Sequence, residues 1–160
     1  MWVLFFKRCS RFFFAGAGRS EVERLGPDDL EDVLDLVTMA FAEHGESTPR
    51  QVMKPHVYRR DRMHEHFGIR QSGTGRLLAV AGVTLRTFVA DGSTLKAAGI
   101  GGVAVHPRLG RNQGLMTQLM DHAIADLRKQ GCSLVMLSGL RQRYGYFGFE
   151  KAGQSISLTL

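Results

Sequence analysis

The stretch GIGGVAVHPRLGRNQGLMTQLMDHAIADL, residues 99–127, decides the fold because it joins an apolar strand to a long helix through a basic loop. Backbone N–H groups at the start of a helix lack partners, and the macrodipole adds positive charge there. The loop is therefore predicted to bind phosphate. The helix itself is indicated by one continuous apolar stripe, formed by Met116, Leu119, Met120, Ala123, Ile124 and Leu127.

Two familiar nucleotide motifs are absent from this stretch. The Walker motif needs Gly-Lys-Ser/Thr, which does not occur here. A dinucleotide-binding motif would follow the apolar run of the strand, but Gly99-Ile100-Gly101 precedes that run. Neither ATP nor a dinucleotide is therefore favoured as the ligand.

The loop and a later aromatic segment together resemble a known family. Arg111-Asn112-Gln113-Gly114-Leu115-Met116 is similar to the Arg/Gln-x-x-Gly-x-Gly/Ala loop of the GNAT superfamily of N-acetyltransferases, with Met116 in the last small position and one extra residue after Pro107. Arg143–Phe149 resembles the Tyr-x-x-x-Gly-Phe segment of that family. The resemblance implies the GNAT acyl-CoA N-acyltransferase fold, an α/β (α+β) fold whose mixed, mostly antiparallel sheet has helices on both faces.

The same resemblance implies a site for acetyl-CoA as co-substrate. Tyr144 matches the tyrosine that protonates the leaving thiolate, whereas Tyr146, like Phe147 and Phe149, is interpreted as a packing aromatic. The pantetheine arm would lie along the strand and the pyrophosphate on the loop amides. The residues implied are Val103, Ala104 and Val105 for the arm, and Arg111, Asn112, Gln113, Gly114, Leu115 and Met116 for the pyrophosphate.

A general base is not evident. Many GNAT members carry a glutamate in the strand before the loop, but residues 96–102 read KAAGIGG and contain no carboxylate. Glu43, His44 and Glu46 are candidates by region, and a chain of water molecules is equally favoured.

Two other candidate sites are set aside. Ser138 follows a strand but lacks a Gly-x-Ser-x-Gly elbow, so a strand-end hydroxyl is the preferred interpretation. No metal site is predicted from His56, His64 and His66, because no Cys or pair of carboxylates accompanies them.

Other elements follow from local patterns along the chain. The expected strands are residues 19–25, an edge strand 67–71, 77–90, 95–105 and 133–137, with a turn at Asp91-Gly92 between the two long strands. A helix is expected from Gly26-Pro27 to residues 43–46. Because a helix connects strand 95–105 to strand 133–137, these two strands are predicted to be parallel.

Composition limits the remaining functions. A chain of 160 residues with 44% hydrophobic content suits one globular domain. The net charge of +6 comes from scattered arginines without an aromatic-interleaved basic run, so a phosphate-rich cofactor is favoured over nucleic acid as the partner. Cys9 and Cys132 are too few for a disulfide framework, which favours a reducing, cytoplasmic location.

Residues 1–18, MWVLFFKRCSRFFFAGAG, differ in composition from the rest and are treated as an aromatic and basic extension before a domain at 19–160. Their length and charges exclude a spanning helix and stable membrane insertion. A signal peptide, peripheral membrane contact and a non-native extension stay open as interpretations.

The segment Arg141–Gly148 looks most like the Eis-type branch of the family, whose members are larger. The resemblance then implies an incomplete first domain that lacks the last strand. An unpaired sheet edge would follow, which predicts a homo-oligomer or poor solubility.

The function expected from these features is acetyl-CoA-dependent transfer of an acetyl group to a primary amine of a small molecule by direct attack. The alternative is a non-catalytic CoA-binding GNAT-like module or a truncated fragment. The acceptor amine cannot be read from the sequence, because acceptor pockets are built from variable loops.

Overall fold

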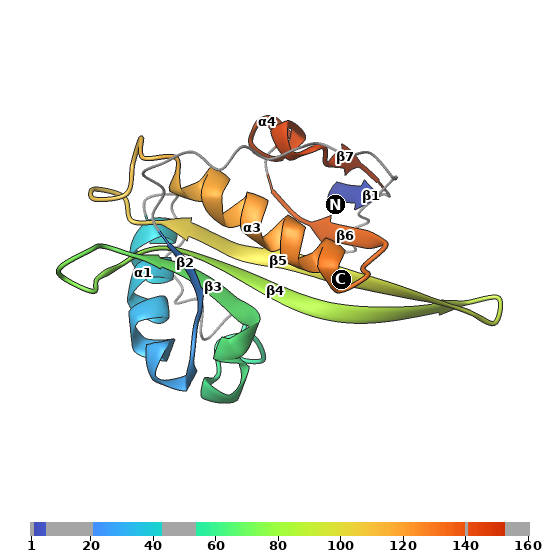
Figure 1. Cartoon of the computed structure of the whole chain (residues 1–160), viewed down its shortest axis with the longest axis horizontal. Helices are drawn as coiled ribbons and strands as arrows, with labels where there is room; N and C mark the ends of the chain where they lie inside the picture. The colour runs from blue at the N-terminus through green and yellow to red at the C-terminus, as the bar shows by residue number, and fades with distance from the viewer. Residues whose placement is uncertain (1, 6–20, 43–53, 140, 153–160) are drawn as a thin grey trace, which may run out of the picture.

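The computed structural model describes residues 2–5, 21–42, 54–139 and 141–152 of the chain. Its strands form one seven-stranded sheet in the order β2-β3-β4-β5-β6-β1-β7 (Figure 1). The strands are β1 (Trp2–Phe5), β2 (Val22–Arg24), β3 (His66–Arg70), β4 (Leu77–Ala90), β5 (Ser93–Val105), β6 (Leu134–Leu137) and β7 (Glu150–Lys151). The helices are η1 (Pro27–Asp29), α1 (Leu30–Ala42), η2 (Arg60–Glu65), α3 (Leu115–Lys129), α4 (Arg141–Tyr144) and η3 (Gly145–Phe147).

The sheet is mixed and mostly antiparallel, as predicted. Among the strands of the described residues, only β5 and β6 are parallel, and every other neighbouring pair runs antiparallel. The helical connection through α3 explains the parallel pair, since a hairpin cannot join parallel strands.

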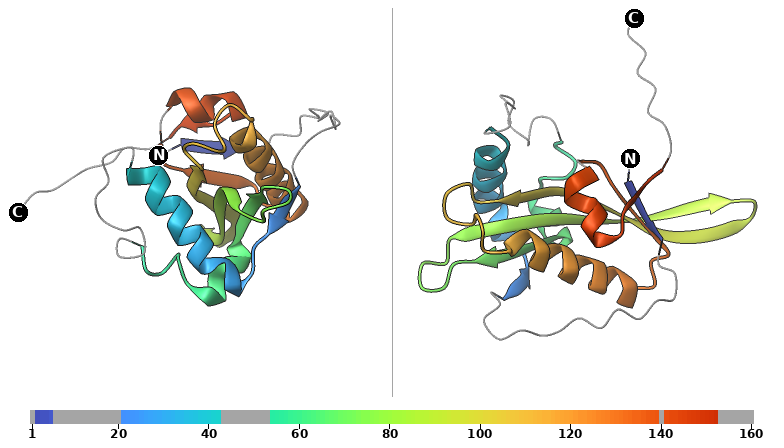
Figure 2. Two further views of the ribbon diagram at one scale, coloured as in Figure 1. Left: turned by 90° about the vertical axis from the view of Figure 1, so that its left-hand side faces the viewer. Right: turned by 90° about the horizontal axis from the view of Figure 1, so that it is seen from above.

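Helices α1 and α3 cover opposite faces of the sheet (Figures 1 and 2). On the α3 face, the predicted stripe is confirmed, with Met116 partly buried and the other five residues inside the core. On the α1 face, a second apolar cluster joins α1 to Tyr58, Met63 and Val80. The sheet thus has an apolar core on each of its two faces, as the resemblance to the GNAT fold implies.

The longest strands, β4 and β5, form a hairpin that projects beyond the rest of the sheet (Figure 2). Its turn residues Asp91 and Gly92 both have positive φ, 48° and 74°, as a type I′ turn requires. The predicted bounds of β4 are confirmed, and β5 begins at Ser93, two residues earlier than expected.

Strand β3 corrects one expectation. The sequence predicts an edge strand at 67–71, but β3 lies between β2 and β4, with Val22 paired to Ile69. The three residues of β2 pair with β3 through contacts distant in sequence, and such pairing is not visible in a local pattern. The outer position belongs to β2.

The first residues of the chain also differ from expectation. Strand β1 lies between β6 and β7 and pairs antiparallel with both, and its Val3 is buried. Trp2–Phe5 therefore cover the outer side of β6. Residues 153–160, to which the missing-strand interpretation referred, lie outside the described residues.

Candidate active site

The candidate site begins where β5 and β6 separate. Their parallel pairing runs from Ala97 with Leu134 to Ile100 with Leu137, and β6 ends there. Strand β5 continues to Val105, so β6 does not pair with its last five residues. An extended molecule can therefore meet the polar backbone edge of β5 at this point.

A cavity of about 760 Å³ opens at this separation. Its wall is formed by the end of β5, by the loop before α3 and the first turn of α3, and by residues after β6. The end of α1 and Lys54 also contribute to it. The lining residues are Ala40, Phe41, Lys54, Ile100, Gly101, Gly102, Val103, Ala104, Val105, Pro107, Gly110, Arg111, Asn112, Gly114, Leu115, Met116, Ser138, Gly139, Arg143 and Tyr144.

His106 anchors the loop between β5 and α3. Its buried Nδ1 accepts hydrogen bonds from the backbone N–H groups of Arg108, at 3.3 Å, and Leu109, at 3.2 Å. Its carbonyl oxygen accepts another from Gly110 at 2.9 Å. The loop is thereby fixed against the end of the sheet, which pre-organises any ligand site that it forms.

The start of α3 leaves its N–H groups available for an anion. Gly114 is the N-cap, with φ of 68°, and no side chain caps this end. Asn112 also has positive φ, 61°, and both residues are exposed and line the cavity. Left-handed residues turn successive N–H groups toward one side, and the helix dipole adds positive charge there. The residues present thus fit a diphosphate.

The cavity includes eight of the nine residues that the resemblance implies for acetyl-CoA. These are Val103, Ala104, Val105, Arg111, Asn112, Gly114, Leu115 and Met116. Gln113 is not among the lining residues; its side-chain Nε2 donates to the carbonyl oxygen of Leu109 at 2.6 Å. Its side chain therefore supports the loop instead of facing the cavity.

Tyr144 also lines the cavity and is 7% exposed. Its ring packs edge-on to Phe149, with 6.4 Å between centroids. Burial raises the pKa of the Tyr144 hydroxyl, and the positive charge of Arg143 opposes this shift. The hydroxyl therefore stays protonated near neutral pH and can donate a proton. Tyr146 is 75% exposed and does not line the cavity.

Several other candidates have different outcomes. Ser138 lines the cavity and is exposed, whereas Glu43, His44 and Glu46 lie outside the described residues. Among the described ranges, no group of three His, Cys, Asp or Glu residues is placed to hold a metal ion. His56 and His64 are exposed, and His66 is buried on β3.

Sequence reasoning missed the contributions of α1 and Lys54 and, in the segment after β6, those of Gly139 and Arg143. Ala40, Phe41 and Lys54 line the cavity from a distant part of the chain, and no local motif marks them. Arg143 could have been found, because it precedes Tyr144. Cys132 is free and buried, as expected for a thiol in the core.

In the described part of the chain, none of the helices is both long enough and apolar enough to span a bilayer.

Comparison with known families gives one match. The family described as acetyltransferase (GNAT) domain matches residues 21–152. No curated protein matches the chain.

Solved structures are similar over most of the chain. A probable N-acyltransferase from Enterococcus faecalis is 25% identical with a TM-score of 0.65, and the match covers 81% of this chain and 32% of that one. A GNAT family acetyltransferase from Brucella melitensis in complex with acetyl-CoA is 18% identical, with a TM-score of 0.67 and coverage of 83% and 84%. A predicted acetyltransferase with acetyl-CoA from Clostridium acetobutylicum is 12% identical, with a TM-score of 0.69 and coverage of 88% and 96%. The chain thus spans about a third of the E. faecalis protein and nearly all of the other two.

Proposed function

The chain belongs to the acetyltransferase (GNAT) domain family, and from this premise we propose that it transfers an acetyl group from acetyl-CoA to a primary amine of a small molecule by direct attack. Acetyl-CoA is the co-substrate of this family, and two of the similar structures hold it. Direct attack needs an uncharged amine beside the thioester, donors for the developing oxyanion and a proton for the leaving thiolate.

One observation carries the proposal: the gap between β5 and β6 opens onto the uncapped start of α3. A pantetheine arm would lie along Val103–Val105, with its diphosphate at Arg111–Met116. The thioester would then lie between the backbone N–H groups of β5 and Tyr144, since both line the same cavity. In this arrangement the β5 amides stabilise the oxyanion and the Tyr144 hydroxyl protonates the sulfur.

Release of free thiol from acetyl-CoA tests the proposal. The full chain is incubated with acetyl-CoA and a panel of polyamines and aminoglycosides, and thiol is measured with and without each amine. The expected result is amine-dependent release. A non-catalytic CoA-binding module would instead show a rise in melting temperature with acetyl-CoA and no thiol release, because a ligand that binds only the folded state stabilises it.

Arg111 is predicted to contribute to acetyl-CoA affinity. Arg111→Glu places a negative charge beside the diphosphate, so the Kd should rise about 10- to 100-fold, the value of a lost hydrogen bond to a charged group. Arg108→Glu is the matched control, because Arg108 carries the same charge on the same loop but does not line the cavity. A titration of melting temperature against acetyl-CoA measures both. Equal affinities for the two variants would contradict the assignment of Arg111.

Three finer points complete the proposal. The Eis-type interpretation is supported by the greater length of the E. faecalis protein, of which the match covers 32%. The domain at 19–160 is proposed to fold together with Trp2–Phe5, because β1 pairs within the same sheet. A reducing, cytoplasmic location is supported by the free thiol of Cys132.

A further inference from the structure

The cavity contains an acid but no base in its described wall. Tyr144 can donate a proton, yet none of the described lining residues is Asp, Glu or His. An acceptor amine is an ammonium ion at neutral pH and has no lone pair until it loses a proton. Among the described residues, a proton acceptor can therefore lie only behind the wall of the cavity.

A row across three strands leads from the cavity to a buried histidine. Register pairs His66 of β3 with Gly82 of β4, and Gly82 with Gly101 of β5. Directly paired residues point to the same face of a sheet. His66, Gly82 and Gly101 thus share the α1 face, and Gly101 lines the cavity.

Two glycines in this row let the imidazole approach β5. A Cβ atom at Gly82 would lie 3.1 Å from His66 Nε2 and 3.2 Å from the carbonyl oxygen of Gly101. A Cβ atom at Gly101 would meet no heavy atom within 4 Å, so the space over this residue is open. Nε2 of His66 therefore lies over Gly82, next to Gly101, and no side chain of β4 or β5 stands between them.

The position beside this row is also open to close approach. Gly102 has φ of 60°, and a Cβ atom there would lie 2.7 Å from the hydroxyl oxygen of Tyr58. The Tyr58 ring is 5.9 Å from the His66 ring, between centroids. Tyr58 therefore packs beside His66 and over Gly102 of β5.

The hydrogen bond at the other ring nitrogen determines the tautomer of His66. Nδ1 lies 3.3 Å from the carbonyl oxygen of Arg62, and a carbonyl oxygen can only accept. Nδ1 must therefore carry the hydrogen, which leaves the lone pair of the neutral ring on Nε2. A proton-accepting atom thus lies on the sheet face that His66 shares with Gly101, a residue of the cavity wall.

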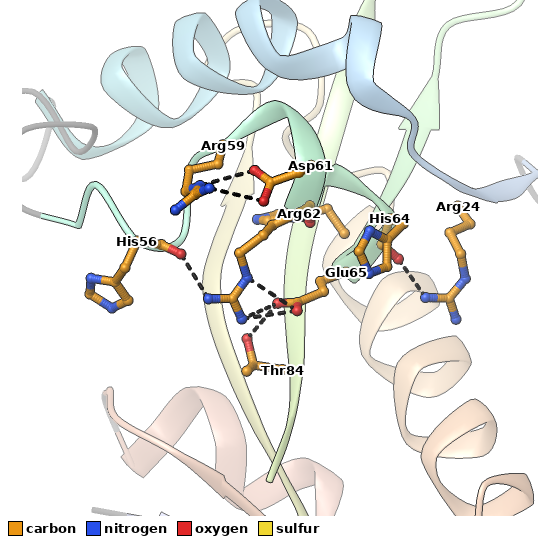
Figure 3. Close-up of polar contacts among 9 residues, drawn as sticks. Arg24, His56, Arg59, Asp61, Arg62, His64, Glu65 and Thr84 are labelled. Carbon is orange, nitrogen blue, oxygen red and sulfur yellow. Dashed lines mark hydrogen bonds and ion pairs between the residues drawn. The ribbon is translucent and has the colours of Figure 1, made fainter.

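A polar cluster holds the Arg62 carbonyl in place (Figure 3). The Arg62 guanidinium donates to both carboxylate oxygens of Glu65, at 2.8 to 3.2 Å, and to the carbonyl oxygen of His56 at 2.8 Å. Thr84 donates to Glu65 at 3.1 Å. Glu65 is thereby engaged by these partners, and its role is to support Arg62.

His66 Nε2 has no partner of its own. The residue is 2% exposed, and Nε2 is one of two buried side-chain polar atoms in the described residues that lack a hydrogen bond. An unpaired buried polar atom costs free energy, so its retention points to a ligand that supplies the missing donor.

We propose that His66 Nε2 accepts the proton that the acceptor ammonium loses, across the side-chain-free positions Gly82 and Gly101. The inference rests on the proposed function and adds the base to it. Because Nε2 is buried and His66 does not line the cavity, the transfer runs through a water molecule in the open space over Gly101. The ammonium N–H bond breaks and its proton passes to this water, which gives up one of its own protons to Nε2, while the electron pair stays on the substrate nitrogen. The amine then attacks the thioester carbon, and the C–S bond breaks. Tyr144 protonates the sulfur and recovers the second proton from the nitrogen, and His66 returns its proton to solvent.

The surroundings of His66 keep it uncharged at neutral pH. Burial lowers the pKa of His66 below 6.5; the hydrogen bond to Arg62 and the charge of Glu65 oppose this, and the charges of Arg62 and His64 reinforce it. The Tyr58 ring also faces it, while β4 and β5 present glycines. The same desolvation would lower the pKa of an ammonium group in the cavity, which brings donor and acceptor closer in basicity.

His66→Asn is the first variant of the test, because the asparagine amide can still donate to Arg62 but cannot take a proton. His66→Gln, which places an amide near Nε2, is the second. His64→Asn is the matched control, since His64 is an exposed histidine two residues away. All three are compared with the wild-type chain by thiol release with spermidine, or with whichever panel amine is acetylated fastest. Melting temperature with and without acetyl-CoA is measured in parallel.

The expected result is a fall in kcat of about 10²- to 10⁴-fold at pH 7 for both His66 variants, with unchanged acetyl-CoA affinity. The deficit should shrink about tenfold for each pH unit up to pH 9, because amine that is already deprotonated needs no base. His64→Asn should behave as wild type.

Three results would overturn the assignment. These are unchanged turnover, a deficit that is the same at every pH, and loss of the folding transition in both His66 variants, which would show a purely structural role. A wild-type chain that binds acetyl-CoA but acetylates no amine would overturn the proposed function itself. This outcome differs from failure of the His66 assignment because it is seen in the wild-type chain, before any variant is compared.

Discussion

Replacing the Tyr144 hydroxyl by hydrogen should lower turnover about 10²- to 10⁴-fold, the usual contribution of a general acid. In Tyr144→Phe the ring keeps its edge-on contact with Phe149 and its place in the cavity wall, so folding and acetyl-CoA affinity should not change. The thiolate of CoA would then leave without a proton donor. The measurement is kcat from thiol release, together with the melting-temperature titration against acetyl-CoA.

The pH dependence gives the same prediction a second readout. Burial raises the pKa of Tyr144 above its ordinary value of 10, so the wild-type acid should stay protonated up to that pH and lose its proton only above it. Tyr146→Phe removes a hydroxyl two residues away that is 75% exposed, and should leave kcat unchanged. Equal turnover in Tyr144→Phe and wild type would remove Tyr144 from the proposed chemistry.

Truncation of Phe149 should have the largest effect on stability. Phe149 is 1% exposed within the α3-face core and packs against Tyr144. Phe149→Ala removes most of the ring and leaves a cavity, so the free energy of unfolding should fall by about 3–5 kcal/mol. For a chain of this size the melting temperature should fall by about 6–20 °C. Thermal unfolding followed by circular dichroism measures the change.

Tyr146→Ala is the control for this truncation, because it deletes an aromatic ring from the same segment at an exposed position. Its free energy of unfolding should change by no more than about 0.5 kcal/mol. If the two truncations destabilised the chain equally, the Tyr144–Phe149 contact would not be part of the core as described.

Features that depend on neighbouring residues were predicted well. The amphipathic stripe of α3, the turn at Asp91-Gly92 and the parallel pairing of β5 with β6 all follow from local periodicity, turn chemistry and connection length. The loop at the start of α3 could be singled out for the same reason, because the groups proposed to bind the diphosphate belong to the backbone. Eight of the nine residues expected at the cofactor line the cavity.

Features that depend on distant pairing were not predicted. Strand β3 is not an edge strand because the three residues of β2 pair with it. Strand β6 is paired on the side away from β5 because Trp2–Phe5, at the start of the chain, lie there. His66 was considered only as a metal ligand, since its spacing from His64 was the signal that the sequence offered. Its lone pair on Nε2, its burial and the glycine row toward the cavity appear only once three strands are side by side.

The sequence by itself determined the family, the strand–loop–helix unit and the tyrosine segment, because each of these is written in residues close together in the chain. Only the tertiary structure decided which strands are neighbours, that α1 contributes to the cavity, and which histidine is buried on the same sheet face as Gly101. The physical reason is that burial and hydrogen-bond satisfaction are properties of the packed sheet, where residues such as Gly82, Gly101 and His66 meet across strands that local patterns cannot order.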